Sequence, residues 1–339
     1  MAYRSTIPLG DPVLDAAVSE GLEAVEARMA AVVHSPDRMI GDASAHLLRS
    51  GGKRLRPLLV LLSAHLGRGI SPEVVDGAVA VELTHLASLY HDDVMDDAPL
   101  RRGAPSAHEV FGPSVAILTG DLLFAKASQI VSGLGPDMVR IQAETFERLC
   151  MGQLHETVGP SPEDDPVAFH IQVLADKTGA LISTSARFGA LLAEAPTTAV
   201  DAVVGFGEAV GVAFQLADDI IDLTSPAEVT GKTPGTDLRE GVPTMPSLLV
   251  QAAARRDRAE GLVDSPDIAL AAAIAGDLTS DVVLAEVVES LRANPALDQA
   301  RQIARTWADR AVSYLEPLPV GTAKRALMDV AELFIARLA

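Results

Sequence analysis

Apolar residues recur along the chain at the spacing of α-helices. Near the N-terminus, Leu14, Val18, Leu22 and Val25 follow one another at intervals of four, four and three, which places them on one side of a helix. Comparable spacing predicts further helices over 56–66, 73–98, 114–133, 137–158, 167–194, 199–223, 245–255, 281–292, 297–315 and 321–338. We see no convincing alternation of the kind that a β-strand requires. The pattern therefore predicts an all-α protein.

Segments rich in turn-forming residues separate the predicted helices. They lie at 50–52, 159–166, 224–243 and 316–321. Several helices are apolar on more than one face, which predicts that they lie in the middle of a helical bundle. No separating segment resembles a long flexible linker. We therefore expect a single domain over 1–339, in which 1–10 form a loosely ordered N-terminal segment.

The composition suits packed helices and gives an acidic protein. Of the 339 residues, 48% are hydrophobic but only 4% are aromatic, and the formal net charge is −19. Such a charge argues against nucleic acid and anionic membranes as partners, because both would repel it. Cys150 is the single cysteine, which excludes an internal disulfide. The sequence shows no signal-peptide pattern, and its longest apolar runs are shorter than the roughly 20 residues of a membrane span. We expect a soluble, cytoplasmic protein without a membrane span.

Two segments carry the same arrangement of aspartates, "DDVMD" at 92–96 and "DDIID" at 218–222. In a helix, the first and last aspartate of each segment share a face, and prolines soon afterwards predict that both helices end there. Carboxylates are disfavoured at a helix C-terminus, so these groups need cations. Oxygen ligands without His or Cys favour Mg²⁺, which bridges carboxylates to substrate phosphates. The alternative, a solvated acidic face, is disfavoured because apolar residues precede both segments. We name them the first aspartate cluster (Asp92, Asp93, Asp96) and the second aspartate cluster (Asp218, Asp219, Asp222).

Cations beside glycines accompany these clusters. Backbone amides and guanidinium groups at such positions can bind a diphosphate. Each position alone is a weak signal, but together with two Mg²⁺ clusters they predict phosphorylated substrates. The candidates come from "RSGGKRLRP", "RRG", "ADKTGALI" and "TGKTPGTD", and they are Lys53, Arg54, Arg56, Arg101, Arg102, Lys177 and Lys232.

With these motifs the sequence resembles the trans-polyprenyl diphosphate synthase family, from "GGKRLRP" to "GTDLREGVPTMP". The resemblance implies an antiparallel helical bundle around a deep central cavity, usually as a homodimer. It implies a head-to-tail condensation of isopentenyl diphosphate with an allylic diphosphate. It also implies that the six clustered aspartates hold two or three Mg²⁺ ions per active site on the allylic diphosphate.

The resemblance further implies roles for single residues. Arg101, Lys177 and Lys232 would bind the allylic diphosphate, while Lys53, Arg56, His85 and Arg102 would bind isopentenyl diphosphate. Catalytic positions would be Lys177, Thr178 and Gln215, the last two beside the developing carbocation. His85 has an alternative interpretation as a hydrogen-bonded core histidine, but its place seven residues before Asp92 favours the site. Two positions depart from the family: Val242 stands where many relatives have Lys, and Tyr90 where a smaller aliphatic residue is usual.

Three other classes share part of this pattern. A class I terpene cyclase would usually replace the second aspartate cluster with an Asn/Ser/Glu-type motif. A metal phosphohydrolase built on "HDD" at 91–93 would need further histidines, yet none follows His170. A non-catalytic subunit of a heteromeric synthase would tend to lose the aspartates that this chain keeps.

The residues before the first aspartate cluster bear on product length. Ala87 and Ser88, one turn earlier, are small, and Thr84 and Val81 further back are modest. The distance from Asp92 to Val81 is about 16 Å at about 1.5 Å per residue, room for roughly three to four isoprene units. Phe124 is either the floor of this path or ordinary core packing. By family likeness we expect a product of about thirty to forty-five carbons, with geranylgeranyl diphosphate as the alternative.

Overall fold

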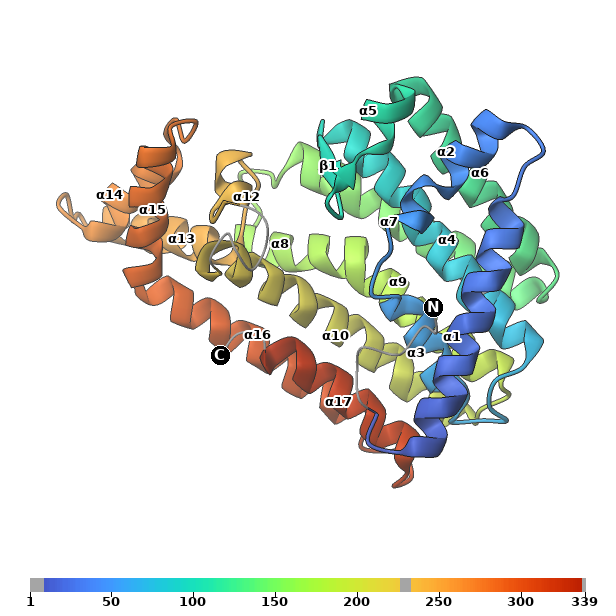
Figure 1. Cartoon of the computed structure of the whole chain (residues 1–339). Coiled ribbons are helices and arrows are strands. Elements are labelled where there is room, and N and C mark those ends of the chain that lie inside the picture. The colour runs from blue at the N-terminus through green and yellow to red at the C-terminus, as the bar shows by residue number, and fades with distance from the viewer. Residues whose placement is uncertain (1–8, 226–232, 337–339) are drawn as a thin grey trace. The chain divides into compact units, whose positions relative to one another are not determined.

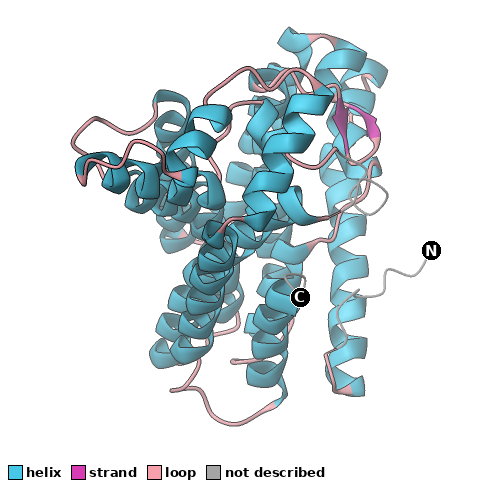
Figure 2. Cartoon of the chain, turned by 90° about the vertical axis from the view of Figure 1, so that its left-hand side faces the viewer, coloured by secondary structure: helices cyan, strands magenta, loops and turns pink. Residues whose placement is uncertain are grey.

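The computed structural model describes residues 9–225 and 233–336, and helices form most of this part of the chain (Figures 1 and 2). Two strands of two residues each, β1 (Leu100–Arg101) and β2 (Ala104–Pro105), pair antiparallel as a small hairpin. The all-α prediction is confirmed. The helices are α1 (Pro12–Val33), α2 (Arg38–Arg49), α3 (Leu55–Ala64), α4 (Pro72–Met95), α5 (Ala107–Phe111), α6 (Pro113–Ser132), α7 (Pro136–Val158), α8 (Pro166–Leu174), the π-helix η1 (Ala175–Gly179), α9 (Ala180–Leu192), α10 (Thr197–Thr224), α12 (Thr236–Arg239), α13 (Met245–Ala259), α14 (Pro266–Ile274), α15 (Asp281–Ala293), α16 (Pro295–Tyr314) and α17 (Thr322–Ala336).

Proline and capping side chains fix where many helices begin. Proline is the first residue of α1, α4, α6, α7, α8, α14 and α16, where its missing N–H costs no helical hydrogen bond. At the start of α1, the Asp11 carboxylate accepts hydrogen bonds from the N–H groups of Val13 and Leu14. Ser71 caps α4 by accepting from the N–H of Val74 at 3.3 Å. These local signals explain why the predicted and observed starts agree closely.

The differences from the prediction have local causes. The expected helix over 167–194 is divided into α8, the π-helix and α9, because the hydrogen-bond register changes there while the apolar spacing continues. The short helices α5 and α12 and the two-residue strands are too brief for a hydrophobic period to reveal them. Helices α2 and α14 were also not predicted.

The described chain divides into two compact units. Unit 1 comprises the described residues of Met1–Arg148, with Ala180–Gly207 and Tyr314–Val330. Unit 2 comprises Leu149–Gly179 and Glu208–Ser313 and the described part of Ala331–Ala339. The single domain over 1–339 stays a prediction, and so does the loosely ordered segment over 1–10, most of which lies outside the described residues.

Helix α4 is the central helix of unit 1. It packs against α1, α3, α6 and α9, and every residue from Gly77 to Thr84 is buried. Helices α3 and α9 approach so closely that a Cβ atom at Gly189 would overlap the carbonyl oxygen of Val60. A helix buried on all sides is held rigidly, so the C-terminal end of α4 can present side chains at fixed positions.

In unit 2 the C-terminal part of α10 forms the core with the helices that follow it. Val212, Leu216 and Ile220 of α10 lie in one buried cluster with Leu291 of α15 and Ala304 of α16. The second aspartate cluster lies at the end of this buried stretch, with the buried Ile220 between its members. As predicted, each aspartate cluster lies at the C-terminal end of its helix, since α4 ends at Met95 and α10 ends at Thr224.

Two helices, α6 and α10, are long and apolar enough to cross a membrane by length and composition. In α10, 67% of the most apolar window is buried inside the protein, whereas in α6 the share is 33%. Core helices of soluble proteins meet the same criterion, so these two helices are weak evidence for a span. The sequence argument missed both because it considered uninterrupted apolar runs alone.

Candidate active site

In the first aspartate cluster, Asp93 is fully buried at the end of α4. Its Oδ1 accepts a hydrogen bond from Nε of Arg101 at 2.6 Å and forms an ion pair with a terminal nitrogen of the same guanidinium at 2.5 Å. Its Oδ2 is also buried and makes no hydrogen bond. Asp92 is half-buried, and Asp96 is exposed as the C-cap of α4. The cluster thus offers carboxylate oxygens of graded exposure, one of them buried without a hydrogen-bond donor.

Two neighbouring arginines of the small hairpin contact different parts of unit 1. Arg101 lies in β1, whereas Arg102 lies in the turn with φ 54°. The Arg102 guanidinium donates to the carbonyl of Leu47, at 3.4 Å, and to that of Gly51. Arg102 is therefore fixed against the glycine loop between α2 and α3, while Arg101 neutralises Asp93.

Glycine is required in that loop for two reasons. Gly51 has φ 81° and Gly52 has φ 147°, conformations that residues with a Cβ atom rarely adopt. A Cβ atom at Gly52 would also lie 2.8 Å from a terminal nitrogen of Arg102. The "SGGKR" segment is therefore shaped around the Arg102 guanidinium.

Arg56, His85 and Arg102 lie close enough to influence one another's ionisation. Burial lowers the pKa of Arg56 to about 10, opposed by the charge of Glu82 and assisted by that of Arg102. Burial, followed by the charges of Arg56 and Arg102, holds the pKa of His85 well below its usual value. The Arg56 Nε is buried without a hydrogen-bond acceptor. A neutral histidine among arginines is an environment that an anion would stabilise. We name Arg56, His85 and Arg102 the basic group.

Arg54, one residue beyond Lys53, is committed to the structure of unit 1. Its guanidinium forms ion pairs with Glu26 of α1 and with Glu82 of α4, the latter at 2.9 Å. The Arg54 and Glu82 side chains are each 2% exposed. Arg54 therefore anchors the start of α3, and Lys53 beside it is exposed.

In unit 2 the second aspartate cluster is tied to a helix start and to a histidine. The Oδ2 of Asp219 accepts a hydrogen bond from the N–H of Met245, at 2.9 Å, at the start of α13. The same oxygen lies 3.0 Å from Nε2 of His170. Asp218 is exposed and Asp222 is half-buried. The positive end of α13 thus stabilises a carboxylate at the negative end of α10.

The predicted catalytic residues Lys177 and Thr178 lie in the π-helix, a feature that often occurs at functional sites. The Lys177 ammonium forms an ion pair with Glu156 of α7, and Thr178 is buried. Gln215 of α10 is half-buried. Lys232 lies outside the described residues, and Val242 is an exposed loop residue.

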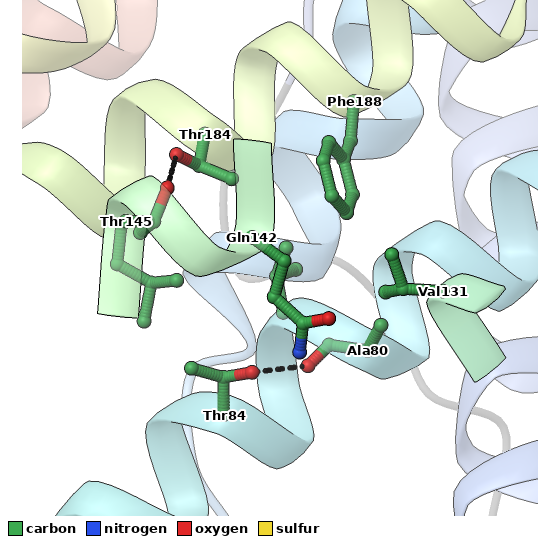
Figure 3. Close-up of a pocket in the computed structure, with 9 residues that line it drawn as sticks. Ala80, Thr84, Val131, Gln142, Thr145, Thr184 and Phe188 are labelled. Atoms are coloured by element: carbon green, nitrogen blue, oxygen red, sulfur yellow. Dashed lines mark hydrogen bonds between the residues drawn. The ribbon is translucent and has the colours of Figure 1, made fainter. Parts of the chain in front are cut away.

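Of the residues proposed to set product length, Thr84, Ala87 and Ser88 lie on α4 and Phe124 lies on α6. A small cavity opens at the level of Thr84 and Val81 (Figure 3). It has room for about one water molecule. Its far wall includes Phe188, which is 1% exposed. Ala87 is buried against this region of the core, and the hydroxyl of the half-buried Ser88 donates to the carbonyl of His85.

The lining of this cavity does not include every residue proposed to set product length. Phe124 is not part of it; its ring packs against His91 and Phe146, with ring centroids 5.7 and 4.4 Å apart. Phe124 is half-buried on α6, and its role as the floor of the product path stays a prediction. Polar groups also line the cavity, since the hydroxyls of Thr145 and Thr184 share a hydrogen bond of 2.6 Å (Figure 3).

Sequence reasoning missed several residues that hold the site in place. Glu26 and Glu82 bind Arg54, Glu156 binds Lys177, and His170 contacts Asp219. These partners come from distant parts of the chain, and no local spacing connects them. Phe188 was missed for the same reason.

Comparison with known proteins identifies the class. The family model for polyprenyl synthetase matches residues 37–266. The nonaprenyl diphosphate synthase of Mycobacterium tuberculosis is 42% identical over 333 residues, which cover 98% of this chain and 96% of that protein. The heptaprenyl diphosphate synthase component 2 of Geobacillus stearothermophilus is 35% identical over 321 residues, or 94% of this chain and 96% of that protein.

A solved structure shows the same fold. The geranylgeranyl pyrophosphate synthase from Corynebacterium glutamicum, crystallised with calcium and isoprenyl diphosphate, has a TM-score of 0.85 and 39% identity. The match covers 98% of this chain and 99% of that one. The chain belongs to the polyprenyl synthetase family.

Proposed function

We propose that this protein condenses isopentenyl diphosphate head to tail with an allylic diphosphate, forming an all-trans polyprenyl diphosphate. The observation that carries the proposal is the basic group of Arg56, His85 and Arg102 beside the Asp93–Arg101 pair. The positive charges of the basic group would be stabilised by a bound anion such as a diphosphate. The near full-length similarity to a nonaprenyl and a heptaprenyl diphosphate synthase supports prenyl transfer and a long product. Geranylgeranyl diphosphate is the alternative product, supported by the solved relative of 39% identity.

Mg²⁺ is the proposed metal, held by the first and second aspartate clusters. The donors fit this ion, because carboxylate oxygens are hard ligands and Asp93 Oδ2 is buried without a hydrogen bond. Calcium in a related solved structure supports a divalent cation. When bound, Mg²⁺ supplies positive charge to the allylic diphosphate.

The protein's own cations divide between the two substrates. Arg56, His85 and Arg102, with Lys53, bind isopentenyl diphosphate, and Arg102 is already oriented by the glycine loop. Arg101, Lys177 and Lys232 bind the allylic diphosphate. Arg101 forms an ion pair with Asp93, so it lies beside a proposed metal ligand and can donate to a diphosphate there.

The chemistry follows from this distribution of charge. Arg101 and Lys177 stabilise the negative charge that develops on the departing diphosphate when the allylic C–O bond ionises. Thr178 and Gln215 present their polar groups to the developing carbocation. The isopentenyl double bond attacks that carbocation, and a proton is then lost to the released diphosphate. The ion pair with Glu156 orients the Lys177 ammonium for this role.

Product length is set along the face of α4 that carries Ala87, Ser88 and Thr84. A product of about thirty to forty-five carbons needs more room than the one water's space at Thr84, so the walls of the small cavity must move. Phe188 stands behind that space and is the aromatic side chain that the growing tail meets there.

The active form is a homodimer that functions in the cytoplasm. Exposed apolar residues on two neighbouring helices of the chain support dimerisation, because apolar patches on a protein surface mark interaction sites. They are Ile117 and Leu118 of α6 and Val139 and Phe146 of α7.

Steady-state assays of single variants test the proposed site. We expect Asp92→Asn and Asp218→Asn to lower kcat by at least about 100-fold. Arg102→Gln should chiefly raise the KM for isopentenyl diphosphate. Asp121→Asn, which changes an exposed aspartate outside both clusters, is the control and should match the parent enzyme. Release of diphosphate with a cyclic hydrocarbon, or no condensation with dimethylallyl, geranyl or farnesyl diphosphate, would contradict the proposal.

A further inference from the structure

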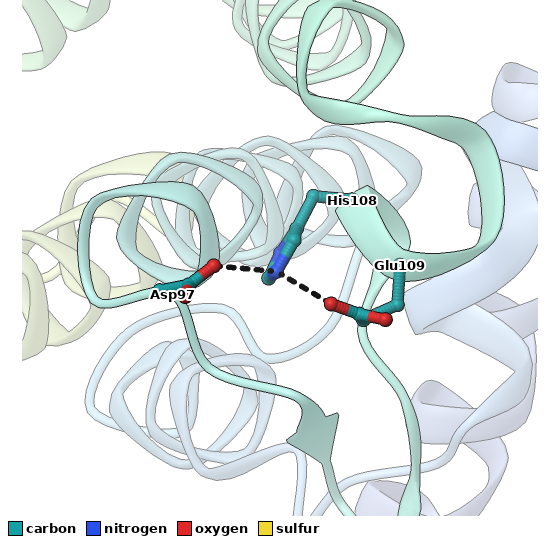
Figure 4. Close-up of side chains that lie close together, drawn as sticks. All are labelled: Asp97, His108 and Glu109. Atoms are coloured by element: carbon teal, nitrogen blue, oxygen red, sulfur yellow. Dashed lines mark ion pairs between the residues drawn. The ribbon is translucent and has the colours of Figure 1, made fainter.

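A histidine and two carboxylates meet beside the hairpin of unit 1. Figure 4 shows Asp97 and Glu109 pointing their carboxylates at His108 from two sides. Oδ1 of Asp97 lies 3.6 Å from Nε2 of His108, and Oε1 of Glu109 lies 3.5 Å from the same atom. The three atoms all lie within 4.8 Å of one another. None of these residues belongs to the aspartate clusters or the basic group.

The histidine at the centre is buried, and one of its ring nitrogens has no hydrogen-bond partner. The His108 side chain is 6% exposed, whereas those of Asp97 and Glu109 are 98% and 52% exposed. Nε2 of His108 makes no hydrogen bond, although it points at both carboxylates (Figure 4). A buried ring nitrogen without a hydrogen-bond partner requires an explanation, because leaving it unpaired costs free energy.

The spacing of the three atoms suits a small divalent ion. Ligands at about 2.1 Å from a tetrahedral ion lie about 3.4 Å from one another. The two distances to Nε2 are close to this value without any movement of the chain. The exposed carboxylates leave the remaining coordination positions to water, as in open three-ligand sites.

The other nitrogen of the ring is held in the manner of a metal ligand. Nδ1 of His108 lies 3.2 Å from the hydroxyl of Ser106, which is fully buried. The Ser106 N–H in turn donates to the carbonyl of Pro99 at 3.0 Å. Histidine ligands are commonly oriented through their second nitrogen in this way, and the contact directs Nε2 at the carboxylates.

We propose that Asp97, His108 and Glu109 form a second divalent-metal site, distinct from the Mg²⁺ clusters, that takes a borderline transition ion such as Zn²⁺. One imidazole with two carboxylates favours Zn²⁺, Co²⁺ or Mn²⁺ over Mg²⁺, which prefers oxygen ligands alone. The ion closes a loop over residues 98–107, which include the hairpin with Arg101 and Arg102. It therefore acts as a clip that orders this segment by restricting its conformational freedom.

The test uses the untagged full chain, treated with a chelator, dialysed and kept in excess Mg²⁺ so that the aspartate clusters are occupied. Co²⁺ is titrated and followed by its visible absorption, and Zn²⁺ binding is measured by displacement of Co²⁺. Asp97→Asn and Glu109→Gln are the main variants, because both side chains are exposed and their loss should leave the fold intact. The matched control is Asp121→Asn, since Asp121 also pairs with a histidine, His91 at 3.4 Å, but belongs to no group of three such ligands among the described residues.

We expect one Co²⁺ per chain, displaced by Zn²⁺, and an affinity at least about tenfold weaker in either main variant but unchanged in the control. Zn²⁺ should also slow tryptic cleavage after Arg101 and Arg102 in the parent chain and not in Glu109→Gln. Equal affinity in the parent and both main variants would overturn the proposal, and so would an absence of bound Co²⁺ or Zn²⁺ in the presence of Mg²⁺. Either result would leave the three residues as an ordinary ion-pair group.

Discussion

Replacing Arg54 with Met should destabilise unit 1 strongly. The Arg54 guanidinium donates to Glu26 and Glu82 and to the carbonyl of Leu48 at 3.2 Å, so its loss removes charge-assisted bonds that hold the start of α3 to α1 and α4. The Glu82 side chain, 2% exposed, would keep its charge but lose its hydrogen-bonded cation, leaving Arg56 as a nearby positive charge. Breaking a buried ion pair on one side costs about 3–5 kcal/mol, and we expect a loss in this range for Arg54→Met.

Urea unfolding followed by circular dichroism measures this loss as a shift of the midpoint. With a slope of about 1–3 kcal/mol per molar urea, the midpoint should fall by at least about 1 M. The double variant Arg54→Met/Glu82→Gln is the essential comparison, because it removes the stranded charge. The double variant should lose clearly less free energy of unfolding than the sum of the losses in Arg54→Met and Glu82→Gln. A midpoint for Arg54→Met within about 0.3 M of the parent, corresponding to under about 1 kcal/mol, would refute the reasoning.

Three further predictions concern packing, pH and product length. Gly189→Ala should lower the free energy of unfolding by about 1–3 kcal/mol in urea titrations, because the added Cβ atom would meet a backbone carbonyl of α3. Gly321→Ala, whose added Cβ atom would have no atom nearer than 4.0 Å, should change this free energy little. Burial and nearby arginines depress the pKa of His85, so below about pH 6.5 the unfolded chain binds a proton at this residue that the folded chain does not. The free energy of unfolding should therefore fall as the pH drops below about 6.5. His85→Gln should flatten this dependence in urea titrations between about pH 5 and 7. Thr84→Phe should fill the small cavity and shorten the products found by mass spectrometry, and an unchanged product range would show that the tail does not pass this point.

Much of the fold could be predicted because the signals are local. Apolar periodicity and proline at helix starts, as at Pro72 and Pro113, are read directly from neighbouring residues. The π-helix could not be predicted, since a change from one hydrogen-bond register to another alters the backbone without altering the apolar spacing. The hairpin of two-residue strands is likewise too short for a pattern.

The candidate site shows the same division between local and distant information. The aspartates and the basic motifs were found because their spacing carries chemistry. Local spacing alone could not tell Arg54 from Arg56, and only the family resemblance assigned Arg56 to a substrate. In the structure Arg54 is bound by Glu26 and Glu82, whereas Arg56 has a buried Nε without an acceptor. Only the folded chain brings the two glutamates to the glycine loop, so the assignment of a cation to structure or to substrate depends on tertiary contacts.

The most direct measurement for the central claim is the product distribution from isopentenyl and farnesyl diphosphates with the purified chain and Mg²⁺. Products are dephosphorylated and sized by mass spectrometry, with a chelator-treated sample beside them. We predict a Mg²⁺-dependent ladder of linear prenyl alcohols that ends at thirty carbons or more. A clean stop at twenty carbons would keep the reaction and contradict the long product. The absence of any linear product longer than the farnesyl starter would contradict the assignment of prenyl transfer itself.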